Sequence, residues 1–216
     1  MTRTKHTDSN QLGFDTLLAD THQQNRQRMF ERETAHLPSS MGEAIPFYAA
    51  LLVAHDIAMK KADIPNITRL RHEARLLAQK LNDHQPGILA GPEAPGNVLM
   101  DRTAAPVGEV PLWGQCGRFN LTLANVPVEI EMHGMLGIAS HSHWLGFAIH
   151  AVDWDKPFFS ETGYRSFLGV HADPATGLGV DDFLTMILSA YLERELKGDL
   201  LEIGAGYRER ARARED

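Results

Sequence analysis

The sequence predicts an α+β fold: an N-terminal helical hairpin with a flanking helix, then a small antiparallel sheet covered by a C-terminal helix. Three observations support this prediction. Apolar residues recur at helical spacing within the first 84 residues. Apolar and polar residues alternate in the segments between 118 and 151, which is typical of half-buried antiparallel strands. A further helical pattern follows at 180–196.

The helical hairpin is expected between residues 46 and 81. Its first helix should begin near Pro46, because proline is tolerated in a first helical turn. Pro65 should break the chain, and Asn66 can cap the second helix. The second helix has an apolar stripe formed by Ile67, Leu70, Ala74, Leu77 and Leu81. Because the link between the helices is short, they should pack antiparallel.

The remaining organisation follows from composition. Residues 1–10 are polar and expected to be disordered, and a flanking helix from about Leu12 to Ala35 has a polar middle. This flanking helix and the hairpin together form a helical region at 11–84. Prolines and glycines in 85–112 predict a connector without long regular elements. The sheet and its helix occupy 113–203, and 204–216 is a charged tail, expected as an exposed helix.

Three strands are expected in the sheet region. The first two are 118–123 and 128–133, in which apolar side chains alternate with polar ones. The third is HWLGFAIHAV, with Phe147 and Ile149 on the apolar side and His150 pointing to the other. Asp181 and Asp182 favour the N-terminus of the following helix, because carboxylates interact well with the helix dipole.

Charge and cysteine content exclude several classes of protein. The net charge of −7 comes mainly from residues 87–203, which hold 6 Lys and Arg against 15 Asp and Glu. This imbalance argues against a nucleic-acid groove, which needs clustered cations. Cys116 is the single cysteine, so a disulfide framework and a Cys-rich zinc site are excluded. No signal peptide and no run of about 18 apolar residues is present, which predicts a cytoplasmic protein without a membrane segment.

The stretch HSHWLGFAIH at 141–150 raises the question of a metal site. His141 and His143 would share one face of an extended chain, and two imidazoles on one face can bind a divalent metal. Glu131 or His133, on the polar side of the preceding strand, could complete the ligand set. In one unbroken strand, however, His141 and His143 would share the apolar face. The alternative is a turn in which both imidazoles are hydrogen-bonded or hydrated.

The segment DWDKPFFSETGYRSF at 153–167 is the second candidate site. It combines aromatic side chains with polar groups, and aromatic residues and arginine dominate binding hot spots. The expected binding residues are Trp154, Phe158, Glu161, Tyr164 and Arg165, and all of these except Glu161 are expected as anchors. The alternative is a structural loop in which Glu161 and Arg165 pair across a turn.

Two other features have simpler interpretations. Cys116 lies among acidic residues, which disfavour a thiolate, so we interpret it as a small apolar filler. Glycines before a helix can bind phosphate, as in TGLGV at 176–180. Here Asp181 and Asp182 follow in the first helical turn and would repel a phosphate, so we expect no nucleotide site.

Two function classes therefore stay open. The leading hypothesis is a non-catalytic binding or accessory protein that recognises another protein, or a small ligand, through 153–167. The alternative is a metal-dependent hydrolase, in which a metal ion bound at the His-x-His pair would activate a water molecule. The sequence alone does not decide whether the chain is an enzyme, or what its oligomeric state is.

Overall fold

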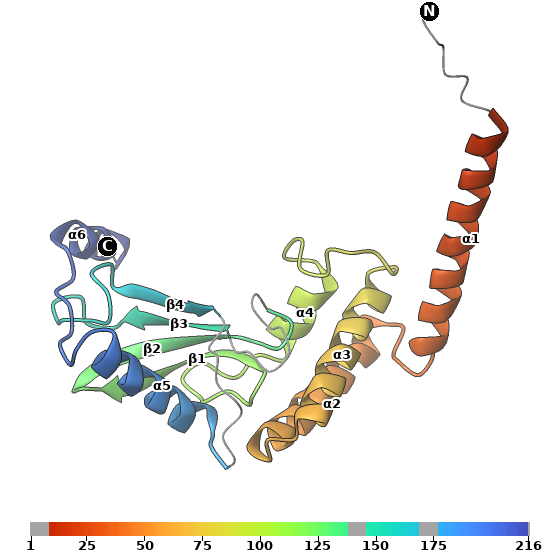
Figure 1. Ribbon diagram of the computed structural model, residues 1–216. Helices are drawn as coiled ribbons and strands as arrows, with labels where there is room; N and C mark the ends of the chain where they lie inside the picture. Colours follow the sequence, from red (N-terminus) through yellow and green to blue (C-terminus); the bar gives the residue numbers. More distant parts are fainter. Residues whose placement is uncertain (1–8, 138–145, 169–176, 216) are drawn as a thin grey trace, which may run out of the picture.

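The computed structural model describes the backbone of residues 9–137, 146–168 and 177–215, with side chains from 21 to 213 in these ranges. It confirms the predicted α+β fold, in which helices precede and follow the four strands of an antiparallel sheet along the chain (Figure 1). The helices of the described residues are α1 (Ser9–Glu33), α2 (Met41–Lys60), α3 (Ile64–Leu81), α4 (Pro95–Arg102), α5 (Val180–Arg194) and α6 (Ala205–Glu215). The strands are β1 (Cys116–Leu123), β2 (Val126–His133), β3 (Gly146–Ala151) and β4 (Tyr164–Leu168).

Helices α2 and α3 form the predicted antiparallel hairpin, but their first residues differ from the prediction. Helix α2 begins at Met41, because the Ser40 hydroxyl accepts from the Glu43 N–H at 3.4 Å and donates to the Glu43 carboxylate at 2.9 Å. Pro46 is therefore inside the helix rather than in its first turn. Helix α3 is capped by Asp63, not by Asn66, since the Asp63 carboxylate accepts from the Asn66 N–H.

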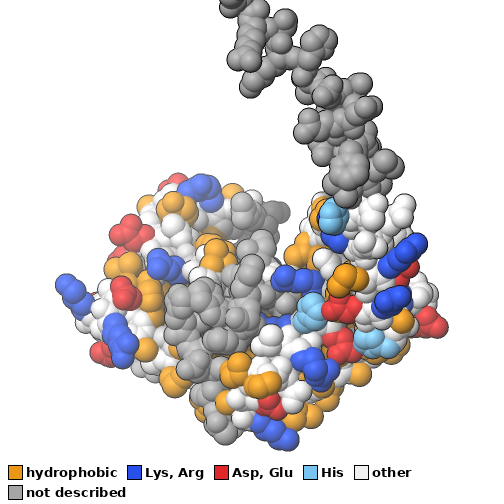
Figure 2. Space-filling model, turned by 45° about the vertical axis from the view of Figure 1, so that its right-hand side comes forward, with side chains coloured by type: hydrophobic (Ala, Val, Ile, Leu, Met, Phe, Trp, Pro, Cys, Tyr) orange, Lys and Arg blue, Asp and Glu red, His pale blue; other side chains and the backbone are white. Residues whose placement is uncertain are grey.

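Helix α1 extends away from the rest of the molecule (Figure 1). Every side chain from Thr21 to Met29 is exposed, in agreement with its polar composition. Lys80 of α3 anchors the end of the helix by donating to the Thr34 carbonyl at 2.8 Å and the Leu37 carbonyl at 2.5 Å. Figure 2 shows cationic, acidic, histidine and hydrophobic side chains intermixed on the face of the helical part that is turned to the viewer.

The Pro/Gly-rich connector contains a helix, α4, where its composition predicts no long regular element. Pro95 stands in the first turn of α4, where its missing N–H costs nothing. A Cβ on Gly96 would lie 2.6 Å from the Ile88 carbonyl oxygen, so the backbone of α4 can approach residue 88 only with glycine there. In this connector, Pro95 begins a short helix and Gly96 allows it to pack closely, so these residue types do not prevent a helix here.

The sheet has the order β1-β2-β3-β4. The β1–β2 hairpin turns at Ala124 and Asn125, which both have positive φ, as in a two-residue hairpin turn. Ile130 lies opposite Phe119 on one side and Ile149 on the other, so the apolar residues of three strands share one face. Strand β4 was not predicted, and it forms from the end of segment 153–167.

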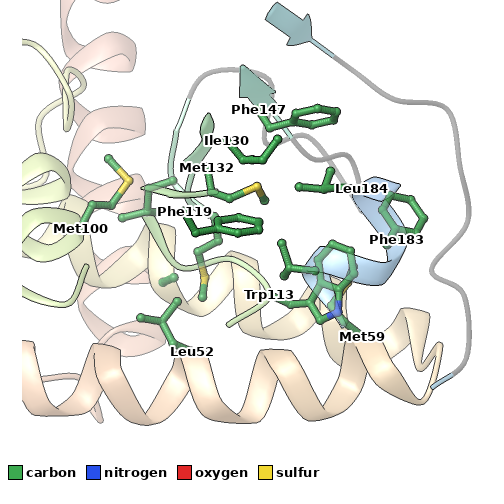
Figure 3. Packing of buried hydrophobic residues seen from close by; sticks show 14 of the residues in the cluster. Leu52, Met59, Met100, Trp113, Phe119, Ile130, Met132, Phe147, Phe183 and Leu184 are labelled. Carbon is green, nitrogen blue, oxygen red and sulfur yellow. The ribbon is translucent and has the colours of Figure 1, made fainter. Parts of the chain in front are cut away.

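Helix α5 covers the apolar face of the sheet, as predicted. Figure 3 shows Phe119, Ile130 and Phe147 directed toward Leu184 of α5. All four side chains are at most 2 % exposed. Trp113, which precedes β1, closes this core and stacks edge-on against Phe183, with the ring centroids 5.3 Å apart.

Candidate binding site

The face of the sheet opposite the core carries polar side chains. Glu131 is central on this face: its carboxylate lies 3.1 Å from Arg118 of β1 and 2.9 Å from His150 of β3. Partial burial opposes ionisation of Glu131, but the hydrogen bonds from His150 and Arg118 outweigh it and lower the pKa of this carboxyl. Glu131 therefore stays ionised at neutral pH and links three strands across their polar face.

A hollow of about 530 Å³ lies at the end of this face next to α6. We call it the aromatic hollow. Its wall is formed by His150, Trp154, Thr162, Gly163, Tyr164, Tyr207, Arg210 and Ala211. The first five of these come from β3 and the segment 153–167, and the last three come from α6. The aromatic hollow is therefore formed by two segments that are about 40 residues apart in the chain.

Several hydrogen bonds connect the two walls of the aromatic hollow. Arg212 of α6 donates to both carboxylate oxygens of Asp155, at 2.7 and 2.9 Å. The Gly204 N–H donates to the Glu161 carbonyl at 2.9 Å. Phe158 and Leu201 exchange two backbone hydrogen bonds of 2.8 Å. The segment 153–167 is thus attached to the residues that lead into α6.

The aromatic rings of the hollow are held in defined positions. Trp154 packs directly on the backbone of Gly163, where a Cβ would lie 2.3 Å from the Trp154 Cζ3 atom. Gly163 also has a φ of +70°, which favours glycine. The ring centroids of His150 and Tyr164 are 5.0 Å apart. The Arg210 guanidinium lies 4.5 Å from the centroid of the Tyr207 ring.

The structure brings two of the five expected binding residues together. Trp154 and Tyr164 line the aromatic hollow. Phe158 is 0 % exposed and belongs to the core, so it is not available as a surface anchor. Glu161 contributes a backbone carbonyl. Arg165 lies on the α5 side of the sheet, with its guanidinium 5.1 Å from the centroid of the Tyr191 ring. No Glu161–Arg165 ion pair is found within the described ranges.

The expected metal ligands are only partly covered by the structure. His141 and His143 lie outside the described residues. Glu131 and His133 project from the same face of β2, as their spacing predicts. Glu131 is paired with His150, which the metal hypothesis did not include. In the three described ranges of the chain, no three His, Cys, Asp or Glu side chains come close enough to hold a metal ion.

Sequence reasoning missed the contribution of α6. On α6, Arg210 follows Tyr207 by three positions and Ala211 follows it by four. This spacing places the three side chains on one side of the helix. This spacing is a usable signal, but it only matters once α6 is known to pack beside residues 153–167.

None of the helices in the described part of the chain is both long and apolar enough to span a lipid bilayer.

Comparison with known proteins gives a family model named "KlcB third domain", which matches residues 116–202. Two curated relatives from Escherichia coli, both named Protein KlcB, also match. One is 36 % identical over 180 residues, which is 82 % of this chain and 42 % of the relative. The second is 34 % identical over 146 residues, or 66 % of this chain and 30 % of the relative. The chain is similar to Protein KlcB.

The chain spans less than half the length of either Protein KlcB relative. The KlcB third domain match begins at Cys116, the first residue of β1, and ends at Glu202. It includes the sheet, the segment 153–167 and α5, and it leaves out α6 with Tyr207 and Arg210. No solved structure matches this chain.

Proposed function

We propose that this chain is a non-catalytic binding protein that uses the aromatic hollow to recognise a segment of another protein. The observation that supports the proposal is that Trp154, Tyr164, Tyr207 and Arg210 meet at one hollow. Tryptophan, tyrosine and arginine are the residues that most often dominate binding energy at protein interfaces. Rings held in place by their neighbours lose little entropy when they bind.

The charges around the hollow indicate what the partner should offer. Arg210 donates from Nε to the Gly206 carbonyl, and no carboxylate pairs with it in the part of the chain that the structure describes. A partner carboxylate could therefore form an ion pair with this guanidinium. The rings beside it favour an apolar or aromatic group. We infer that the recognised segment carries an acidic residue next to an aromatic or apolar residue.

Site-specific photocrosslinking tests the proposal and does not require that the partner be identified first. A photoreactive amino acid at Tyr207 should capture a defined protein from host cells, and Trp154→Ala in the same chain should reduce that product at least tenfold. The photoreactive group at Met186, which is 46 % exposed on α5, serves as the control position. The proposal fails if both positions give the same products, or if Trp154→Ala leaves the Tyr207 product unchanged while the variant remains folded.

The second candidate, a metal-dependent hydrolase, has one specific observation in its favour. Glu131 and His133 lie two residues apart on one face of β2, and the buried Nδ1 of His133 has no hydrogen-bond partner among the described residues. Elemental analysis of untagged protein would separate the two functions. We expect less than about a tenth of an equivalent of metal per chain if the binding function alone is correct, and about one equivalent for the hydrolase.

A further inference from the structure

A second hollow lies on the same face of the sheet, near the ends of β1 and β2 that adjoin α4. Its volume is about 520 Å³, within the usual range for small-molecule sites. We call it the α4 hollow. Much of its wall is apolar, with contributions from Leu89, Met100, Ala104, Ala105 and Val107. It shares no lining residue with the aromatic hollow, so the two can be tested separately.

Helix α4 contributes two hydrogen-bond acceptors to this wall. Asn97 and Asp101 both line the hollow and stand four residues apart, which places them on one side of the helix. The Asn97 amide nitrogen donates to the Leu89 carbonyl at 3.4 Å and the Gly91 carbonyl at 2.8 Å. Its donors are thereby used, and the side-chain oxygen is left as an acceptor.

Asp101 is an exposed carboxylate of this wall and lacks a counterion among the described residues. No cation pairs with its carboxylate in the described portions of the chain. The other ionised groups of the hollow are already paired, because Arg118 lies 3.5 Å from Glu129 and 3.1 Å from Glu131. Burial, together with the nearby carboxylates of Asp101 and Glu131, raises the pKa of the Cys116 thiol to about 12. The thiol is therefore neutral, and Asp101 leaves the hollow with one uncompensated negative charge.

We propose that the α4 hollow binds a small primary amine with an apolar body. The ammonium group would donate hydrogen bonds to Asp101 and Asn97, and the hydrocarbon part would lie along Leu89 and Met100. Ammonium groups carry three donors and no acceptor, which matches the acceptors of Asn97 and Asp101 on the α4 side of the hollow. Carboxylates and alcohols of the same size lack this complementarity, so the hollow should discriminate among the three by charge.

Methionine methyl NMR of the full chain tests this proposal with three probes of equal length: hexylammonium, hexanol and hexanoate. Hexylammonium should shift the Met100 methyl resonance in a saturable manner, while the resonance of the exposed Met186 stays unchanged. Hexanol should bind more weakly and hexanoate weakest. Asp101→Asn should weaken hexylammonium binding about tenfold, as expected for the loss of a charge-assisted hydrogen bond.

Two further variants keep the test decisive. Glu93→Gln removes an exposed carboxylate close to α4 in the sequence but outside the hollow, and it should leave hexylammonium binding unchanged. Ala104→Phe should fill the hollow and abolish binding of every probe. The proposal is overturned if hexanoate binds as tightly as hexylammonium, if Asp101→Asn binds like the unmodified chain, or if Ala104→Phe still binds.

Discussion

The His55 Nε2 atom accepts a hydrogen bond from the Arg71 Nε–H at 2.9 Å, and both side chains are buried between α2 and α3. His55 Nδ1 lies 2.7 Å from the Trp113 carbonyl oxygen, to which it donates as the neutral imidazole. The adjacent Asp56 carboxylate accepts from the Trp113 N–H at 3.2 Å. His55, held in place by Arg71, and Asp56 thus connect the helical hairpin by hydrogen bonds to the segment that leads into the sheet.

Acid should weaken the fold through His55. Burial, reinforced by the Arg71 charge, lowers the pKa of His55 from 6.5 to about 4. The unfolded chain therefore takes up this proton first, and the free energy of unfolding falls as the pH drops from 6.5 toward 4, by about 3 kcal/mol in all. Urea unfolding measured at a series of pH values would show the slope.

His55→Gln provides the comparison for that slope, because it removes the titrating group. The variant should be less stable at pH 7, since a flexible glutamine side chain replaces a fully buried imidazole ring and loses rotamer freedom when it is ordered. Between pH 6.5 and 4, however, it should lose less stability than the unmodified chain. Parallel stability curves for the two proteins over this range would contradict the assignment.

Gly163→Ala should displace the Trp154 ring. The added Cβ would lie 2.3 Å from Trp154 Cζ3, and the φ of +70° strains any L side chain. We expect a loss of about 1–3 kcal/mol in stability and a shift in tryptophan fluorescence. Gly198→Ala is the matched control: its φ is +87°, but nothing lies within 4 Å of its Cβ. Similar losses and similar fluorescence for both variants would show that crowding against Trp154 is unimportant.

Phe158 and Trp154 should behave differently when replaced by alanine, although both were expected as binding anchors. Phe158 is fully buried, so Phe158→Ala should cost about 3–5 kcal/mol, measured by urea unfolding. Trp154 is partly exposed in the wall of the hollow, so Trp154→Ala should cost clearly less. Equal losses would mean that the Trp154 ring is a core element, which would weaken its role as an anchor.

Ser40→Ala should destabilise α2 by about 1 kcal/mol, because it removes the hydroxyl that caps the Glu43 N–H. The neighbouring Ser39 is also exposed and has no side-chain hydrogen bond among the described residues, so Ser39→Ala is a control of identical chemistry. Thermal unfolding of both variants would suffice. A melting temperature for Ser40→Ala that is no lower than that of Ser39→Ala would contradict the capping role.

The strands in which apolar and polar residues strictly alternate were predictable, because burial of one sheet face requires an apolar side chain at every second position. Val128, Ile130 and Met132 are buried, while Glu129 and Glu131 are not. Strand β4 gave no such signal: Arg165 takes a position on the apolar face, where its guanidinium rests on the Tyr191 ring. Only the neighbouring helix makes that position suitable for arginine.

The candidate site was predictable on one wall only. The aromatic content of 153–167 identified Trp154 and Tyr164, yet the other wall depends on how α6 packs. Sequence patterns report which side chains share a strand or helix face, and they do not report which distant segments meet. The same limit applies to α4, where the packing of Gly96 against residue 88 became visible only in three dimensions.

Trp113 stands three residues before the match to the KlcB third domain begins. Its indole N–H donates to the Leu178 carbonyl at 3.0 Å, and its ring is 2 % exposed. An expression fragment cut at the limits of the KlcB third domain match, 116–202, would therefore lack this interior ring and leave Phe183 facing water. The folding unit is larger than the matched segment 116–202, and truncations intended to isolate it should begin upstream of residue 113.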